Sequence, residues 1–314
     1  MARNQVSTRL HAISRENSDL NRLLCLIVFI TPCFLSCTLF VSQIDSVTDF
    51  LPRDTDLSGW SRISPPAEYS GSGIKRYNKN YYKTGIKRFS ICRYEPSGED
   101  TVITAEVARF DNVLNSYGFF SRICGERSFK ADTVNESVSD NFAAALRGEY
   151  VIHIFTLPGS GDNREILKTF MNISLKYIGI NYSKDMLPEQ INVLKGPDKY
   201  GIIYSVKSLD VPYGIDRIFL TRWIRKGRAV TVFASERGSF SDSYALFRER
   251  INSGFILSES GTVYSAFRQE GDASYTFISV YKNWIYGVQK TADIETGKKI
   301  TEAIQSGIMA YTAE

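Results

Sequence analysis

Four carboxylates lie near two similar segments of the chain, at comparable places in each: Glu106, Asp111, Glu236 and Asp242. Glycosidase-type hydrolysis requires two carboxyl groups about 5–10 Å apart across a cleft. The sequence supplies the groups but fixes no distance between them, and solvated or helix-capping roles explain them more simply. We therefore expect no catalytic residue, and keep an envelope hydrolase with carboxylates at the interface of the two halves as the alternative function.

Other chemistries lack the residues that they require. Only two histidines are present, His11 and His153, so histidine-rich zinc sites and Ser-His-Asp triads have almost no raw material. We expect His153 to lie on a strand without an evident partner, facing solvent or bonded in place. The glycine-rich loop 158–162 lacks the Lys-Ser/Thr of a phosphate-binding P-loop. The sequence thus predicts no metal site and no cofactor site.

The cysteines divide into two groups. Cys25, Cys33 and Cys37 lie in one apolar segment, while Cys92 and Cys124 stand alone in the remainder of the chain. The latter two can form one disulfide in an oxidising compartment, or remain buried thiols that pack as small apolar side chains. Both alternatives stay open at this point.

The N-terminal segment predicts export. Residues 1–22 are basic, residues 23–41 form an uncharged apolar run of 19 residues, and residues 42–52 are a polar linker. Such a run is long enough to span a bilayer, and its basic flank keeps the N-terminus cytoplasmic. It is either an uncleaved anchor or a signal peptide whose end, Phe34-Leu35-Ser36-Cys37, resembles a relaxed bacterial lipobox with Cys37 as the lipidated residue. Both interpretations predict a protein of the bacterial cell envelope, membrane-anchored with residues 45–314 outside the cytoplasm.

Composition narrows the class of protein further. The chain is 43% hydrophobic and 13% aromatic, which is enough for a sizeable core and excludes global disorder. The net charge is +4 and Lys and Arg are spread along the chain, so we expect no nucleic-acid partner.

An internal similarity organises the region after the linker. Residues 116–123 reappear loosely as residues 243–251, each as the start of a helix that follows a strand hairpin and precedes further strands and a closing helix. The pattern predicts two α+β repeats, 53–180 and 181–314. Because the helices are set apart from hairpin-linked strands, we expect each half to be an antiparallel sheet with helices packed on one face.

The tract Tyr77–Gly85 is both aromatic and basic. It can contact a ligand or an anionic surface, or form a short helix or loop whose tyrosine rings pack on the core. We favour the packing interpretation.

Several short motifs occur in a characteristic order: Leu51-Pro52, Gly59-Trp60, the Tyr77–Gly85 tract, Ser116-Tyr117-Gly118-Phe119-Phe120-Ser121, Asn141-Phe142 and Gly148-Glu149-Tyr150-Val151. In this order they resemble a bacterial family of exported proteins or lipoproteins with an uncharacterised two-repeat domain. The chain departs from the family in the aromatic tract, where an acidic Asn-Gly-Gly-Ala stretch is usual. The resemblance implies an exported location and a two-repeat architecture, and it implies no chemistry.

The predicted function is a non-enzymatic, membrane-anchored envelope protein. Its partners would be the membrane, through the N-terminal segment, and a partner protein or small ligand. The 18 tyrosines suit recognition at a groove between the halves.

Overall fold

The computed structural model describes residues 46–82, 84–97, 101–128, 135–157, 161–179, 187–196, 200–205, 214–252, 254–260, 263–271 and 274–313. The chain forms two compact units, residues 1–45 and 46–314, and every described residue belongs to the second. The expected membrane segment and the lipidation candidate Cys37 therefore lie outside the described residues. No helix in the described part is long and apolar enough to cross a membrane.

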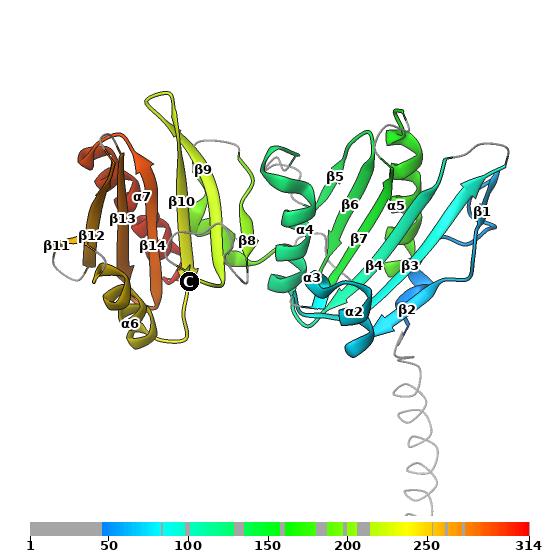
Figure 1. Ribbon diagram of the computed structural model, residues 1–314, viewed down its shortest axis with the longest axis horizontal. Helices are drawn as coiled ribbons and strands as arrows, with labels where there is room; N and C mark the ends of the chain where they lie inside the picture. The colour runs from blue at the N-terminus through cyan, green and yellow to red at the C-terminus, as the bar shows by residue number, and fades with distance from the viewer. Residues whose placement is uncertain are drawn as a thin grey trace, which may run out of the picture. The chain divides into compact units, whose positions relative to one another are not determined.

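The first half of the second unit is built on an antiparallel seven-stranded sheet (Figure 1). Its strands are β1 (Trp60–Arg62), β2 (Ala67–Ser70), β3 (Ile86–Pro96), β4 (Ile103–Phe110), β5 (Glu136–Val138), β6 (Phe142–Arg147) and β7 (Tyr150–Thr156). The order is β1-β3-β4-β7-β6-β5, and β2 also pairs with β3. The helical elements of this half are η1 (Val47–Phe50), α2 (Ser72–Tyr77), α3 (Lys79–Tyr82), α4 (Val113–Ser128) and α5 (Arg164–Ile178).

The second half repeats this plan with another antiparallel seven-stranded sheet of order β11-β12-β13-β14-β10-β9-β8. Its strands are β8 (Ile203–Ser205), β9 (Ile218–Arg225), β10 (Arg228–Glu236), β11 (Ile256–Ser260), β12 (Val263–Glu270), β13 (Ser274–Tyr281) and β14 (Trp284–Thr291). The helical elements are η2 (Glu189–Leu194), α6 (Phe240–Ile251) and α7 (Ile294–Tyr311). In both sheets the strand before the motif helix pairs with the last strand of the half. The α+β class with two antiparallel halves is as predicted.

The expectation that helices pack on one face of each sheet is wrong. On β4, Ile103 and Ala105 share a hydrophobic cluster with Phe170 of α5. Ala108 and Phe110 of the same strand share another cluster with Phe120 of α4. Since alternate residues of a strand point to opposite faces, α4 and α5 cover opposite faces of the first sheet. This explains why strand β4 is buried along most of its length rather than at every second residue.

The second sheet is covered in the same way. Val232 packs with Ile304 of α7, while its neighbour Phe233 packs with Phe247 of α6. Both helices begin at capped ends, because Ser239 accepts a hydrogen bond from the Asp242 amide and Asp293 accepts one from the Thr296 amide. Each half therefore has three layers, with a sheet between two layers of helices. We expect functional side chains where a helix leaves the sheet uncovered, or where a helix covers polar residues of the sheet.

Candidate functional site

A buried carboxylate with three hydrogen-bond donors lies on the α4 side of the first sheet. Glu106, on β4, is 4% exposed. Its Oε2 lies 3.1 Å from Nδ1 of His153 and accepts a 3.1 Å hydrogen bond from the Tyr81 hydroxyl. Its Oε1 accepts a 3.4 Å hydrogen bond from the Tyr77 hydroxyl. We refer to Glu106, His153, Tyr77 and Tyr81 as the Glu106 cluster.

Backbone pairing and a short helical segment bring these residues together. Glu106 and His153 are directly opposite each other in the β4–β7 ladder, so their side chains share one face. Tyr77 ends α2 and Tyr81 lies in α3, four residues later, and the Tyr81 amide donates to the Asn78 carbonyl across the junction. A buried carboxylate is costly unless it is hydrogen-bonded, so the three donors are what allows Glu106 to occupy this position.

The carboxylate holds both phenols in their protonated form. Burial, together with the charge of Glu106 and the hydrogen bond to it, raises the pKa of Tyr77 to about 12. The same causes raise the pKa of Tyr81. Both hydroxyls are therefore donors at neutral pH. With a carboxylate at Oε2, the neutral imidazole of His153 is the Nδ1–H tautomer, which leaves Nε2 as an acceptor.

Aromatic rings enclose the tyrosine side of the cluster. Tyr77 lies 5.0 Å from Tyr69 and 4.9 Å from Phe89, measured between ring centroids. Tyr81 makes edge-to-face contacts with Phe89 at 5.3 Å and with Phe119 of α4 at 5.1 Å. These contacts fix both hydroxyls in place, since the rings that carry them are packed on several sides.

On its other side, His153 belongs to a half-buried aromatic ledge, which we define as Phe142, His153 and Phe155. The imidazole stacks on Phe155 with ring centroids 4.6 Å apart and meets Phe142 edge-on at 6.3 Å. Its side chain is 17% exposed, and within the described part of the chain Nε2 has no hydrogen-bond partner. A ligand that reaches the ledge can therefore stack on its rings and donate a hydrogen bond to Nε2.

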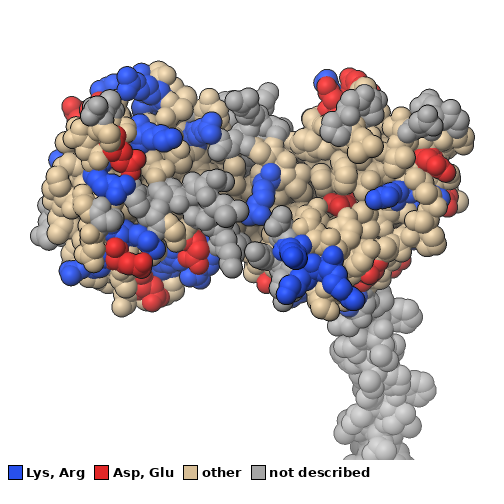
Figure 2. Space-filling model, viewed as in Figure 1, with Lys and Arg blue, Asp and Glu red and all other residues tan. Residues whose placement is uncertain are grey.

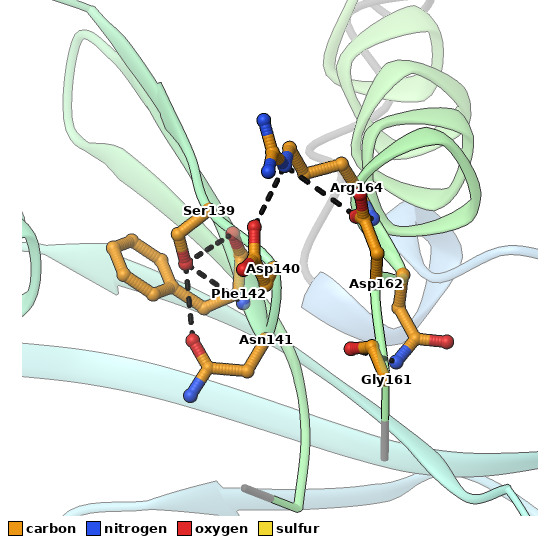
Figure 3. A network of polar contacts seen from close by, with 8 residues as sticks. Ser139, Asp140, Asn141, Phe142, Gly161, Asp162 and Arg164 are labelled. Carbon is orange, nitrogen blue, oxygen red and sulfur yellow. Dashed lines mark hydrogen bonds and ion pairs between the residues drawn. The ribbon is translucent and has the colours of Figure 1, made fainter. Parts of the chain in front are cut away.

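A polar network fixes the end of the ledge (Figure 3). The Phe142 amide donates a 3.2 Å hydrogen bond to Oγ of Ser139, and Nε of Arg164 lies 2.7 Å from Asp140 and 3.4 Å from Asp162. The arginine thus joins the start of β6 to the start of α5. The network also places the carboxylates of Asp140 and Asp162 near residues 161–162, the part of the glycine-rich loop that the structure describes. Their negative charge disfavours a phosphate there.

The two sheets can be aligned residue by residue through equivalent hydrogen bonds. Ser116 on α4 donates to the Gly148 carbonyl in the β6–β7 turn, and Ser243 on α6 donates to the Lys282 carbonyl in the β13–β14 turn. Just before these helices, the Phe110 amide donates to the Glu149 carbonyl. In the second half the Arg237 amide donates to the Asn283 carbonyl in the same way.

With this alignment, the Glu106–His153 pair corresponds to the Phe233–Gly287 pair of β10 and β14. Phe233 is fully buried, and a Cβ added to Gly287 would lie 2.7 Å from its ring. The second half therefore fills with an aromatic ring the position at which the first half has a buried acid and a histidine. The fold does not require polar residues here, which marks the Glu106 cluster as a feature of the first half alone.

The four predicted carboxylates have separate surroundings. Asp111 accepts a 2.7 Å hydrogen bond from Asn115 at the start of α4. Glu236, at the end of β10, accepts from Gln190 at 3.2 Å and Asn283 at 3.3 Å, while Asp242 lies in the exposed first turn of α6. Within the described ranges, no group of three or more His, Cys, Asp and Glu side chains could hold a metal ion.

The aromatic groove expected between the halves stays a prediction. A cavity of about 520 Å³ lies where the start of α4 meets η2, and its lining is aliphatic and polar: Asn112, Val113, Leu114, Leu187, Pro188, Glu189 and Gln190. Several aromatic side chains gather around Glu106 on the first sheet. His153, expected to lack an evident partner, pairs with Glu106. Sequence reasoning singled out both residues but missed that they meet.

The disulfide between Cys92 and Cys124 does not form, because both thiols are free and buried. Cys92 on β3 packs in the cluster under α5, whereas Cys124 of α4 packs on the opposite face, with the sheet between them. Burial raises the pKa of the Cys92 thiol and raises the pKa of the Cys124 thiol to about 12. Both are therefore unreactive apolar side chains at neutral pH.

No family model matches the chain, and no curated protein matches it. A solved structure, the extracellular domain of PknH from Mycobacterium tuberculosis, aligns over 84% of this chain and 94% of that chain. The identity is 7% and the TM-score 0.17, which is too low to indicate a shared fold. The functional argument therefore depends on the Glu106 cluster itself.

Proposed function

We propose that this chain is a membrane-anchored protein of the bacterial cell envelope, with residues 45–314 outside the cytoplasm, and that its first half binds a small ligand at the Glu106 cluster. The anchor is the apolar run 23–41, either as a transmembrane helix or as a signal peptide that leaves Cys37 lipidated. The order of short motifs that resembles an exported bacterial family supports this location. Labelled palmitate should enter the wild type and not Cys37→Ser if Cys37 is lipidated.

One observation is the main support for the proposed ligand site. At equivalent places in the central strand pairs of the two sheets, β4–β7 and β10–β14, one half has Glu106 opposite His153 and the other has Phe233 opposite Gly287. A buried acid contributes less to stability than a packed ring, so its presence favours a role in recognition. The ligand class that fits is a small molecule with a flat ring, which stacks on Phe142 and Phe155, and with a donor for Nε2 of His153.

Native mass spectrometry of the full chain, extracted from its membrane in mild detergent, tests the site. We expect the wild type to retain an adduct of defined mass. The double variant Glu106→Phe/His153→Gly copies the packing of the second half and should fold without the adduct, with its melting temperature as the control. An adduct that survives in the double variant places the ligand elsewhere. A bare wild-type monomer contradicts the ligand site and directs attention to a protein partner.

The hydrogen bond between His153 Nδ1 and Glu106 Oε2 favours one second candidate, an envelope hydrolase. A carboxylate that orients an imidazole is the arrangement of a general base, and Nε2 could accept a proton from a water molecule. Assays against a glycan and peptide panel decide this. Turnover that Glu106→Gln abolishes and Asp242→Asn preserves would establish the hydrolase, whereas turnover unchanged in both variants removes it.

A further inference from the structure

Residues 69–94 carry seven basic side chains and no acidic one, in a chain whose 38 Lys and Arg are otherwise balanced by 34 Asp and Glu. The basic residues are Lys75, Arg76, Lys79, Lys83, Lys87, Arg88 and Arg93. The ligand site accounts for the tyrosines of this stretch but not for its positive charge. A run of like charge on a folded surface attracts a partner of opposite charge.

The basic side chains gather on one surface. Lys75 and Arg76 lie on α2, Lys79 begins α3 and Lys87 lies near the start of β3, and all four are exposed. Figure 2 shows Lys and Arg side chains massed over α2 and α3. We call Lys75, Arg76, Lys79 and Lys87 the basic surface.

The folded unit begins beside β2, the strand that leads into α2. Ser46, its first residue, donates a hydrogen bond to Glu68 on β2, and Glu68 pairs with Arg88 on β3 at 3.3 Å. Only residues 42–45 separate Ser46 from the apolar run 23–41. Four residues span at most about 14 Å when fully extended. A bilayer that holds residues 23–41 would therefore have its headgroups close to the strand that adjoins the basic surface.

We propose that the basic surface docks on anionic lipid headgroups of the membrane that anchors the chain. This inference rests on the proposed membrane anchoring and is independent of the ligand site. Lysine and arginine near a lipid surface are attracted to anionic headgroups, and the attraction decays over a Debye length of about 8 Å at physiological ionic strength. The short tether keeps the start of the folded unit near the bilayer, and docking of the basic surface would orient the first sheet relative to the membrane.

Lysine acetylation of the full chain in nanodiscs tests the proposal. One preparation contains phosphatidylcholine alone and the other adds phosphatidylglycerol. We expect Lys75, Lys79 and Lys87 to react several-fold more slowly in the anionic nanodiscs, while exposed Lys168 on α5 and Lys298 on α7 react at equal rates in both. The protection should disappear at 1 M salt, where the Debye length is about 3 Å.

A charge-reversed variant separates docking from other causes of protection. In Lys75→Glu/Arg76→Glu/Lys79→Glu, Lys87 should react at the same rate in both nanodiscs, whereas the matched variant Lys168→Glu/Lys176→Glu/Lys298→Glu should keep the wild-type protection. Equal rates at Lys75 and Lys79 in both wild-type preparations would overturn the docking while leaving the anchor intact. A chain that does not enter nanodiscs at all would overturn the anchor, and the docking with it.

Discussion

Glu106 shows how one buried carboxylate can organise the side chains around it. Its carboxylate is the common acceptor for His153, Tyr77 and Tyr81, so removing it leaves three donors without their acceptor, those of His153 and Tyr81 half-buried and that of Tyr77 on a 39% exposed side chain. Unsatisfied donors cost more than the lost hydrogen bonds themselves. The residue therefore contributes to stability only because its partners are present.

We expect Glu106→Ala to lower the free energy of unfolding by about 3 kcal/mol, since all three donors lose their acceptor. Glu106→Gln keeps one acceptor oxygen and should cost about half as much. Urea unfolding followed by circular dichroism measures both, with exposed Asp242→Ala as a control that changes stability by less than about 0.5 kcal/mol. Equal losses for Ala and Gln would show that the acceptor has no role in stability.

The Cys124 thiol predicts a dependence of stability on pH. Its pKa is about 12 in the folded state against 9.0 ordinarily, so between these values the unfolded state binds fewer protons than the folded state. The free energy of unfolding therefore falls as pH rises through this window, by up to about 4 kcal/mol from this group. Unfolding measured from pH 9 to 12 should be less steep in Cys124→Ala, and identical slopes would contradict the buried thiol.

At the scale of single residues, the sequence predicted only part of the site. Glu106 stood out as a carboxylate and His153 as one of two histidines, but 47 residues separate them. Their meeting depends on the exact pairing of β4 with β7, and the apolar pattern of those strands permits several registers. The comparison of equivalent positions in the two halves could have found the pair, because Phe233 and Gly287 are the apolar counterparts.

At the scale of elements, the sequence predicts the strands of the two sheets well, but not the placement of the helices that cover them. The hairpins β3–β4, β6–β7 and β9–β10 follow from alternating apolar residues and tight turns. The sequence did not reveal that helices cover both faces of each sheet. A strand buried on both faces has a continuous apolar run, and this run can be read as the apolar side of a strand that is buried on one face only. The short strands β1, β5 and β11 are not evident in the sequence, since their pairing is supplied by neighbouring strands rather than by their own composition.

Gly287 tests how tightly β14 and β10 pack. A Cβ at this position would overlap the Phe277 carbonyl oxygen and lie 2.7 Å from the Phe233 ring, so Gly287→Ala should destabilise the protein by about 3 kcal/mol. Gly73→Ala in α2 is the matched control. Its added Cβ would lie at an ordinary contact distance, 3.8 Å from Tyr69, so the substitution would only reduce the backbone freedom of the chain. Thermal melts compare the two. If Gly287→Ala leaves the melting temperature unchanged, the packing of the two sheets differs less at this position than the alignment indicates.

At the scale of the whole molecule, α4 links the first half to the second. The Tyr117 hydroxyl donates to the Ile202 carbonyl, and Oγ of Ser121 accepts a 3.3 Å hydrogen bond from the Tyr204 amide at the start of β8. A single hydrophobic cluster includes Phe120 of α4 and Phe219 of β9. The two halves that the sequence predicts as repeats therefore share part of their core, which a pattern within each repeat cannot reveal.

This shared core predicts coupled stability. A Cβ at Gly118 would lie 2.8 Å from the Tyr204 ring and 3.2 Å from its carbonyl oxygen, so Gly118→Val should weaken the contact of α4 with β8. We expect hydrogen exchange to accelerate in peptides from both β4 and β10, because unfolding of either sheet exposes the common cluster. Acceleration confined to the first half would contradict the coupling.

The central claim is that the Glu106 cluster binds a ligand through His153, and nitrogen NMR of the histidines tests it most directly. Only His11 and His153 contribute signals, and His11→Gln leaves His153 alone. We predict an Nδ1–H tautomer, and an Nε2 resonance that differs between protein as extracted and protein refolded to remove bound molecules. An Nε2–H tautomer, or the same Nε2 resonance in both preparations, would contradict the claim.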